Sequence, residues 1–244
     1  MGIEVIEHIL LCSYLSPTPK KRAIADLIVI AFFFLLRVGE YTHTAANNRR
    51  TQQFRLCDIV FRRAHVIMAH HHSEATLSNA DSASLHISDQ KNGAKGQIVG
   101  QDATRQIVCP IKALARRVHN IVAHGGSPTT ILGTYWGRGN TWRTIRPPDI
   151  NATIKQAVVT LKLESRGITP DLVSSHSLRA GGAMALHLSG ASADTIKKQG
   201  RWSGDTYQQY IHNQLSAFQT GLSSKMLKPH HSFHLGLPTT TRSI

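Results

Sequence analysis

The chain has 244 residues, enough to bury a sizeable core in one large domain. Its 28 Lys and Arg against 14 Asp and Glu give a net charge of +14, which favours a polyanionic partner, with nucleic acid ahead of an acidic membrane surface. Only 17% of the residues are charged, and this excludes a disordered, charge-rich chain.

Two helices are expected in the N-terminal part. Pro17 and Pro19 break a first short helix, and Ala23 to Val38 reads as a long apolar helix. Its longest apolar run, Leu27 to Leu36, has ten residues, which is too few to cross a bilayer, so we expect no membrane segment. Gly39 and the polar stretch to about residue 51 are expected to form the exit loop.

Short β-prone runs replace the helical pattern from Phe54 to about Val108. Asn92-Gly93 separates the last two runs and is a strong hairpin signal. We therefore expect a small antiparallel sheet in this region.

Helices dominate the C-terminal half. Pro110 opens a helix that Gly125-Gly126 ends, and Gly133 to Pro148 reads as a loop rich in Gly, Trp and Arg. The helices expected after this loop cover Asp149 to about Leu163, His176 to Leu188, Ser192 to Gln199 and Asp205 to Leu215. The expected fold class is therefore mainly α with a small antiparallel β-sheet (α+β).

Cysteine and histidine usage indicates no metal site. The three cysteines are widely scattered and odd in number, so they fit neither a disulfide framework nor a zinc site, and they favour a reducing, intracellular environment. His70–His72 and His230–His231 are runs of neighbours that lack the spacing of metal ligands.

Arg37 is the first of several side chains suited to a phosphodiester. It ends the apolar helix in FFLLRVGEYT, and its planar guanidinium matches phosphate oxygens in pairs. Glu40, one turn later, is placed to orient it. The structural alternative is a cation that caps the helix and complements its dipole.

His176 and Arg179, in HSLR, are three residues apart and so share one helix face. Ser174-Ser175 are candidate N-caps, which would put His176 in the first turn, near any bound anion. Gly181-Gly182 follow and indicate that another backbone approaches closely, because glycine is otherwise unfavourable inside a helix. A surface His/Arg pair on an ordinary helix is the alternative.

The phrase GRWSGDTYQQY supplies Trp202 and Tyr210, and either could instead be core. Tyr207 lies one helical turn before Tyr210 and is its rival. Lys91 precedes the expected hairpin turn, with Lys95 as its competitor across the turn. A lysine at a hairpin tip is otherwise a solvated guard of the sheet edge.

The order Arg, Lys, HxxR, Trp, Tyr over about residues 20 to 215 resembles the tyrosine recombinases (the phage-integrase family), in particular the recombinases of eukaryotic crypton-type mobile elements. The resemblance implies a DNA breaking-rejoining catalytic domain at 23–215, after a lead-in at 1–22. The segment 216–244 would include a tail rich in Pro, His, Ser and Thr that we expect to be mobile. The family usually carries a DNA-clamping domain before the catalytic one, and only 36 residues precede Arg37.

The resemblance also implies roles. The catalytic set would be Arg37, Lys91, His176, Arg179, Trp202 and Tyr210, with Glu40 in support. Tyr210, favoured over Tyr207 by the family's spacing, would form a 3′-phosphotyrosyl link, and Lys91, the first lysine of its motif, would protonate the departing 5′ oxygen. The tyrosyl ester conserves the bond energy, so neither metal nor ATP is implied.

Double-stranded DNA is the implied partner, and an intracellular location with chromosomal DNA (the nucleus in a eukaryote) follows from it. The residues expected to add DNA contacts are Lys95, Arg138, Arg143 and Arg201. The loop that holds Arg138 and Arg143 could equally pack on the core. Family members assemble as tetramers on two sites, whereas an isolated catalytic domain could be a monomer. The alternative functions are a type IB topoisomerase and a catalytically silent DNA-binding remnant of a mobile-element recombinase.

Overall fold

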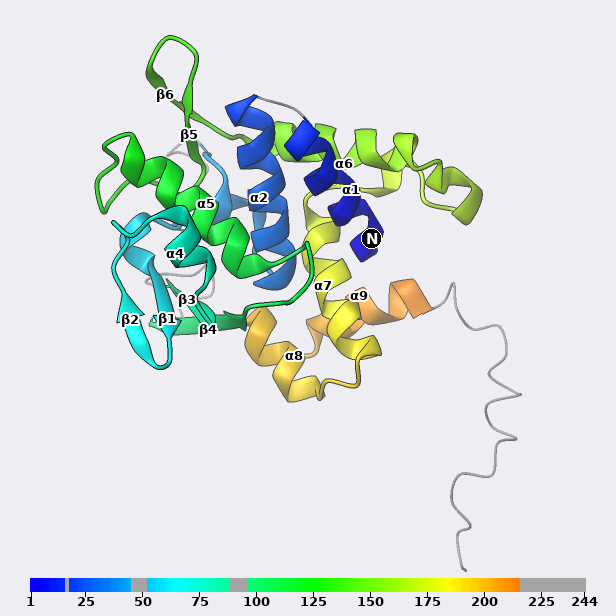
Figure 1. Ribbon diagram of the computed structural model, residues 1–244. Helices are drawn as coiled ribbons and strands as arrows, with labels where there is room; N and C mark the ends of the chain where they lie inside the picture. Colours follow the sequence, from blue (N-terminus) through cyan, green and yellow to red (C-terminus); the bar gives the residue numbers. More distant parts are fainter. Residues whose placement is uncertain (16–17, 45–51, 88–95, 216–244) are drawn as a thin grey trace, which may run out of the picture.

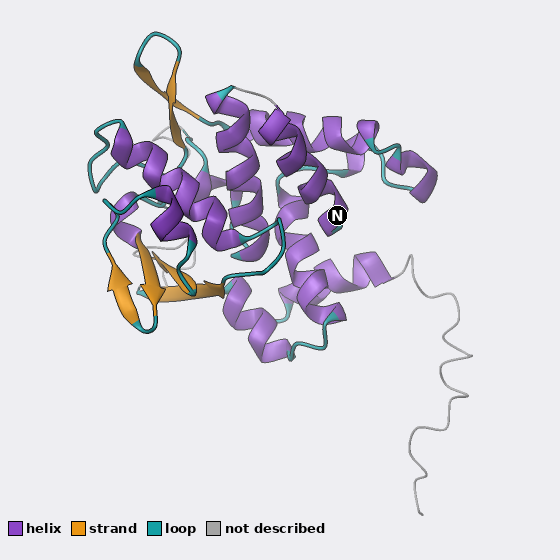
Figure 2. Ribbon diagram, viewed as in Figure 1, coloured by secondary structure: helices purple, strands orange, loops and turns teal. Residues whose placement is uncertain are grey.

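The computed structural model describes residues 1–15, 18–44, 52–87 and 96–215, without the side chains of residues 210 and 212–215 (Figure 1). Helices dominate, and a small antiparallel sheet lies to one side of the helical body (Figure 2). The expected class, mainly α with a small antiparallel sheet, is confirmed. None of the helices in these ranges is long and apolar enough to cross a membrane.

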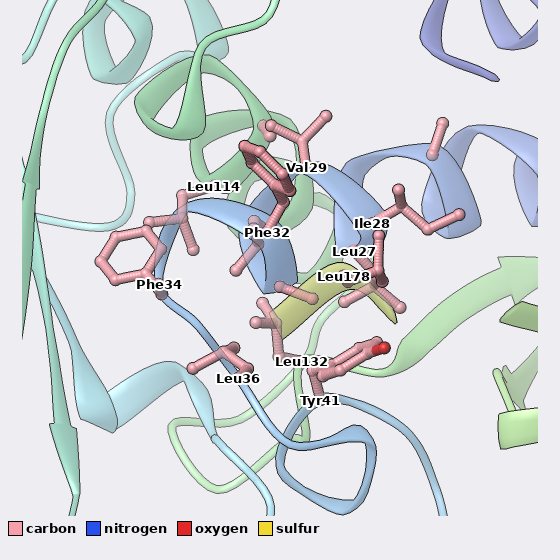
Figure 3. Packing of buried hydrophobic residues seen from close by; sticks show 14 of the residues in the cluster. Leu27, Ile28, Val29, Phe32, Phe34, Leu36, Tyr41, Leu114, Leu132 and Leu178 are labelled. Atoms are coloured by element: carbon pink, nitrogen blue, oxygen red, sulfur yellow. The ribbon is translucent and has the colours of Figure 1, made fainter. Parts of the chain in front are cut away.

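Helix α2 (Pro19–Phe33) forms the centre of the helical body, and each residue from Ala23 to Phe32 is buried. The helices that pack on it are α1 (Ile3–Leu15), α5 (Pro110–Ala123), α6 (Pro147–Thr160) and α7 (His176–Leu188). Figure 3 shows Phe32 of α2 in the same apolar cluster as Leu114 of α5 and Leu178 of α7. A helix covered on every side needs an apolar residue at nearly every position, and this explains the unbroken apolar run.

The central helix ends at Phe33, so the predicted extension to Val38 is wrong. Leu35 adopts a left-handed conformation, with φ of 50°, and the chain turns before the short helix α3 (Val38–Tyr41). Phe34, Leu35 and Leu36 are all buried. The apolar pattern therefore continues through a buried turn, which periodicity cannot distinguish from a helix.

The predicted antiparallel sheet is present. Its strands are β1 (Ile59–Arg63), β2 (Val66–Met68), β3 (Ser82–Ile87) and β4 (Gln97–Asp102), in the order β2-β1-β3-β4. Ile59, Leu85 and Val99 lie opposite one another across three strands and are buried. A 3-10 turn (Leu56–Asp58) leads into β1, and α4 (Glu74–Ser78), which the sequence did not predict, packs against α5. The expected turn with Lys91 and Lys95 lies outside the described residues.

The segment 133–148, predicted as a loop, contains a hairpin of β5 (Thr134–Gly137) and β6 (Thr141–Thr144), so that prediction is wrong. Trp136 and Trp142 are direct cross-strand partners with ring centroids 5.0 Å apart. Such aromatic pairs stabilise a hairpin, but each strand has only four residues and lies among Gly and Arg, so the sequence pattern was too short to predict them. Figure 1 shows this hairpin projecting from the helical body.

The remaining elements are two 3-10 turns (Leu163–Arg166 and Pro170–Leu172), α8 (Ala193–Gly200) and α9 (Thr206–Leu215). A second apolar cluster joins α7, α8 and α9 to the turn after α2 through Leu35, Ala183, Met184, Ile196, Tyr207 and Ile211. A Cβ on Gly182 would collide with the carbonyl oxygen of Phe32, and one on Gly181 with that of Met1. The close backbone approach predicted from these glycines is therefore confirmed.

Candidate functional site

A cleft of about 570 Å³ opens where α3, the start of α7 and the segment between α8 and α9 meet. Its lining residues are Leu36, Arg37, Val38, Ser175, His176, Arg179, Arg201, Trp202, Ser203 and Thr206. The fold thus brings four of the expected catalytic residues, Arg37, His176, Arg179 and Trp202, from separate parts of the chain to one cavity, together with Arg201, which was expected to contact DNA.

Arg37 occupies the N-cap position of α3, at the edge of the cleft, and its side chain is 26% exposed. Its backbone N–H donates to Glu40 Oε2 at 2.8 Å, and its Nη1 donates to Glu40 Oε1 at 3.2 Å. The anticipated contact between Glu40 and Arg37 is therefore present. Since Glu40 holds one nitrogen of the guanidinium from below, the partly exposed remainder lies at the cavity wall.

Arg201, which was expected to contact DNA, lines the cleft but is bound from within the protein. Its side chain is 1% exposed, and its two terminal nitrogens donate to both oxygens of Glu40 at 2.8 and 2.9 Å. One of them also donates to the Leu35 carbonyl at 3.2 Å. A guanidinium paired in this way with a buried carboxylate stabilises the floor of the cleft.

Glu40 is the buried acid of this network. Burial alone would raise its pKa, but the Arg201 charge and hydrogen bonds, joined by Arg37, outweigh burial and hold the pKa below its ordinary value. Glu40 is therefore ionised at neutral pH. One carboxylate beneath three arginines leaves the cleft with an excess of positive charge.

Arg179 is 3% exposed and is fixed by main-chain acceptors. Its guanidinium donates to the carbonyls of Leu35 and Gly200 and lies over the Trp202 ring, 4.3 Å from the ring centroid. This is a cation–π contact in a partly desolvated place. The indole packs tightly there, because a Cβ on Gly200 would overlap it. Arg179 and Trp202 therefore form one rigid wall of the cleft.

His176 lies in the first turn of α7, as predicted, and is exposed to the cleft. Its backbone N–H donates to Ser174 Oγ at 3.2 Å, whereas Ser175, which occupies the N-cap position, makes no capping hydrogen bond through its side chain. Partial burial and the neighbouring Arg179 charge lower the pKa of His176. At neutral pH the imidazole is therefore uncharged and can accept a proton.

The other expected residues either have side chains outside the described part of the chain or lie away from the cleft. Tyr210 belongs to α9, which starts at the cleft with Thr206, but its side chain, like Lys91 and Lys95, is outside the described residues. Its rival Tyr207 is 5% exposed and packs in the second apolar cluster, with its ring 6.1 Å from Trp202. Arg138 and Arg143 are exposed on the β5–β6 hairpin, outside the cleft.

Three hydroxyl side chains in the cleft wall were not anticipated as site residues: Ser175, Ser203 and Thr206. Each lies inside or beside a phrase that the sequence had singled out, so proximity to HSLR and GRWSGD was the available signal. Ser175 is held by its backbone N–H, which donates to Asn151 Oδ1 of α6 at 2.7 Å. The cleft thus combines arginines, a neutral imidazole and hydroxyl donors, which is a set suited to a phosphate group.

The sequence matches no protein-family description and no curated protein. Among solved structures, the chain is similar to the Tn1549 transposon integrase in complex with transposon right end DNA, with a TM-score of 0.46 and 12% sequence identity. The match covers 90% of this chain and 61% of that one, so this chain spans less than two thirds of the integrase structure.

Proposed function

We propose that this protein cleaves and rejoins DNA strands as a tyrosine recombinase, with Tyr210 as the nucleophile. The observation that carries the proposal is the convergence of Arg37, His176 and Arg179 on one cleft, although His176 lies 139 positions after Arg37 in the chain. A basic protein that only coats nucleic acid has no need to gather two arginines and an uncharged histidine around a cavity.

In this mechanism Arg37 and Arg179 bind the non-bridging oxygens of one phosphate and neutralise the charge that builds on them as phosphorus is attacked. Arg179 is held by two carbonyls and an indole, so little reorganisation is needed when the phosphate arrives. The same positive field lowers the cost of forming a phenolate on Tyr210, whose ordinary pKa near 10 makes it a poor nucleophile at neutral pH.

The step is a transesterification. The Tyr210 oxygen forms a bond to phosphorus while the bond from phosphorus to the 5′ oxygen breaks, which leaves a 3′-phosphotyrosyl ester and a 5′-hydroxyl. His176, uncharged at neutral pH, takes the phenol proton. Lys91 gives a proton to the departing 5′ oxygen, and the reverse sequence rejoins the strand. The Trp202 indole supports the phosphate by holding Arg179 over its face.

The burial of Tyr207 supports Tyr210 as the nucleophile. Tyr207 is 5% exposed, in the cluster that also holds Met184 and Ile196, and a residue that fills a core does not swing toward phosphorus. A Tyr207→Phe variant removes its hydroxyl and keeps its packing, so it is the matched control for Tyr210→Phe.

A nicked suicide duplex tests the proposal, because strand cleavage then releases a short fragment and traps the protein on DNA. We expect the wild type and Tyr207→Phe to form a covalent adduct that survives denaturation, and Tyr210→Phe to form none. Arg179→Lys, which keeps the charge and loses the fork, should lower the adduct rate by about 100-fold or more. An adduct that persists in Tyr210→Phe would refute the assignment.

The two alternatives give different outcomes. A type IB topoisomerase would relax a supercoiled plasmid as a single molecule, whereas a recombinase exchanges strands between two sites. We propose recombination, on a DNA-bound tetramer and with chromosomal DNA as substrate, in a chain of the crypton type. The absence of any adduct together with salt-dependent duplex binding would favour the silent DNA-binding remnant.

A further inference from the structure

The β5–β6 hairpin is braced by three rings. Trp136 stacks on His124, at the end of α5, with centroids 5.3 Å apart and an interplanar angle of 26°. Trp142 packs edge-on to Trp136 at 5.0 Å and is itself 38% exposed. Aromatic contacts of this kind hold the two strands to each other and to α5. The hairpin thus projects from the helical body (Figure 1) and is held by these ring contacts, with the Trp142 indole partly open to solvent.

The outer part of this hairpin is cationic. Arg138, in the turn, and Arg143, in β6, are exposed. The Arg143 stem lies across Gly137, where a Cβ would come within 2.7 Å of Arg143 Cδ, so the guanidinium is carried along the hairpin edge. The sequence from residue 131 to residue 146 contains three arginines and no Asp or Glu. A surface with this composition attracts an anion.

The root of the hairpin is tied to the cleft on both sides. The His43 N–H donates to the Ile145 carbonyl at 2.7 Å, and His43 follows α3, the helix that Arg37 caps. After the hairpin the chain enters α6, where Asn151 holds Ser175 in the cleft wall. The hairpin and the cleft are therefore parts of one continuous framework.

We propose that the β5–β6 hairpin is a second contact for the DNA duplex, beside the cleft. Arg138 and Arg143 pair with backbone phosphates, and the exposed Trp142 packs on the sugars between them. This proposal rests on the proposed function, since it requires a duplex in the cleft. Four residues of strand extend about 13 Å, which corresponds to the axial rise of about four base pairs of duplex. The contact is to the backbone and carries no sequence preference.

Salt dependence of duplex binding tests this contact. Each phosphate contact contributes about 0.9 to the slope of log K against log salt, so Arg138→Ala/Arg143→Ala should lower the slope by about 1.8. Lys162→Ala is the control, because Lys162 is an exposed cation just beyond the opposite end of α6. Fluorescence anisotropy with a labelled duplex at several salt concentrations gives the slope, and thermal unfolding verifies that each variant is folded.

We expect the double arginine variant to bind at least about tenfold more weakly at low salt, with the Lys162→Ala affinity and slope close to wild type. Trp142→Ala should weaken binding with an unchanged slope, whereas Trp142→Phe should retain most of it. Equal slopes for wild type and Arg138→Ala/Arg143→Ala would overturn the proposal, as would an equal loss in Lys162→Ala, which would indicate only a general effect of charge.

The covalent adduct separates this proposal from the proposed function. At saturating duplex, Arg138→Ala/Arg143→Ala should form the adduct to the wild-type level, because the cleft is intact. A wild type that forms no adduct, with a slope that still falls in the double variant, would refute strand cleavage and support the hairpin contact. A wild type that binds no duplex would overturn both.

Discussion

Replacing Glu40 by Gln tests how far the cleft depends on one buried acid. In the folded protein both carboxylate oxygens accept from Arg201, at 2.8 and 2.9 Å, and each also accepts from Arg37. The side chains of Glu40 and Arg201 are 3% and 1% exposed. Glutamine keeps the shape of the side chain but removes the charge and offers an N–H where Arg201 needs an acceptor.

The expected loss of stability follows from the buried charge that the substitution leaves unpaired. Glu40→Gln leaves the Arg201 guanidinium buried without a counter-charge, and breaking a buried ion pair in this way costs about 3–5 kcal/mol. The loss is therefore a large fraction of the total stability of a domain of this size. Since Arg37 also loses its anchor, the adduct rate should fall in conditions where the variant is still folded.

Asp58→Asn is the matched control within the same chain. Asp58 accepts from the Arg55 N–H at 2.8 Å and from the Arg55 guanidinium at 3.4 Å, the same arrangement three residues apart that joins Glu40 to Arg37. The Asp58 site lacks the second contact that Arg201 gives to Glu40. The stability lost in Asp58→Asn should therefore resemble that lost when a capping residue is replaced, about 0.5–2 kcal/mol.

Urea unfolding followed by circular dichroism measures these losses of unfolding free energy. The variants can be compared directly when their m-values are equal. A double variant, Glu40→Gln/Arg201→Met, removes both partners and should recover part of the loss, with an interaction energy of at least about 1 kcal/mol. A Glu40→Gln loss no larger than that of Asp58→Asn, or strict additivity in the double variant, would refute the network as the source of stability.

Three further outcomes are expected. Burial raises the pKa of Asp26 to about 6 despite the opposing Arg116 charge and hydrogen bond, so its contribution to stability is present below its unfolded pKa and is lost as pH rises through 6. Relative to Asp26→Asn, the wild type should therefore lose about 2 kcal/mol of unfolding free energy from about pH 4 to pH 8, and a relative gain in urea titrations would contradict this. Burial and the Arg179 charge lower the pKa of His176, so the neutral imidazole should persist to below pH 6.5 and the adduct rate should fall only below that pH. His176→Gln should lose this decrease in rate at acid pH. A decrease that begins above pH 6.5 in the wild type would exclude the lowered pKa. Gly182→Ala places a Cβ against the Phe32 carbonyl and the Leu35 side chain and should cost about 1–3 kcal/mol of unfolding free energy, whereas Gly204→Ala, whose Cβ would have open space, should change stability little in the same denaturation experiment.

Local sequence patterns predicted the features that depend on residues close together in the chain. The start of α7 at His176 followed from candidate caps, and the close approach at Gly182 from the cost of glycine in a helix. The role of Arg201 was not predictable in this way, because its partner Glu40 is 161 residues distant in the chain. An arginine bound for a buried carboxylate and one bound for a phosphate look alike in a sequence, and only the fold separates them.

The largest error in the sequence-based description lies at the site itself. Had α2 continued to Val38, Arg37 would have remained on the helix; instead the left-handed Leu35 ends it and Arg37 caps α3 at the cleft edge. A left-handed turn at a branched residue costs about 1–2 kcal/mol, and two features oppose that cost. The Leu35 side chain is buried among residues of α7 to α9, and its carbonyl accepts from both Arg179 and Arg201.

The Leu35 carbonyl, which accepts from both arginines, connects the strained turn to the cleft. Arg179 and Arg201 come from α7 and the end of α8, so the Leu35 carbonyl receives these two hydrogen bonds when the helices are docked, and the same docking carries His176 and Trp202 into the cleft. We therefore expect the backbone turn and the cleft to form together. Predictions from sequence periodicity assume regular structure, so they fail at a strained turn such as this one. The strain there is balanced by contacts with residues that are distant in the chain.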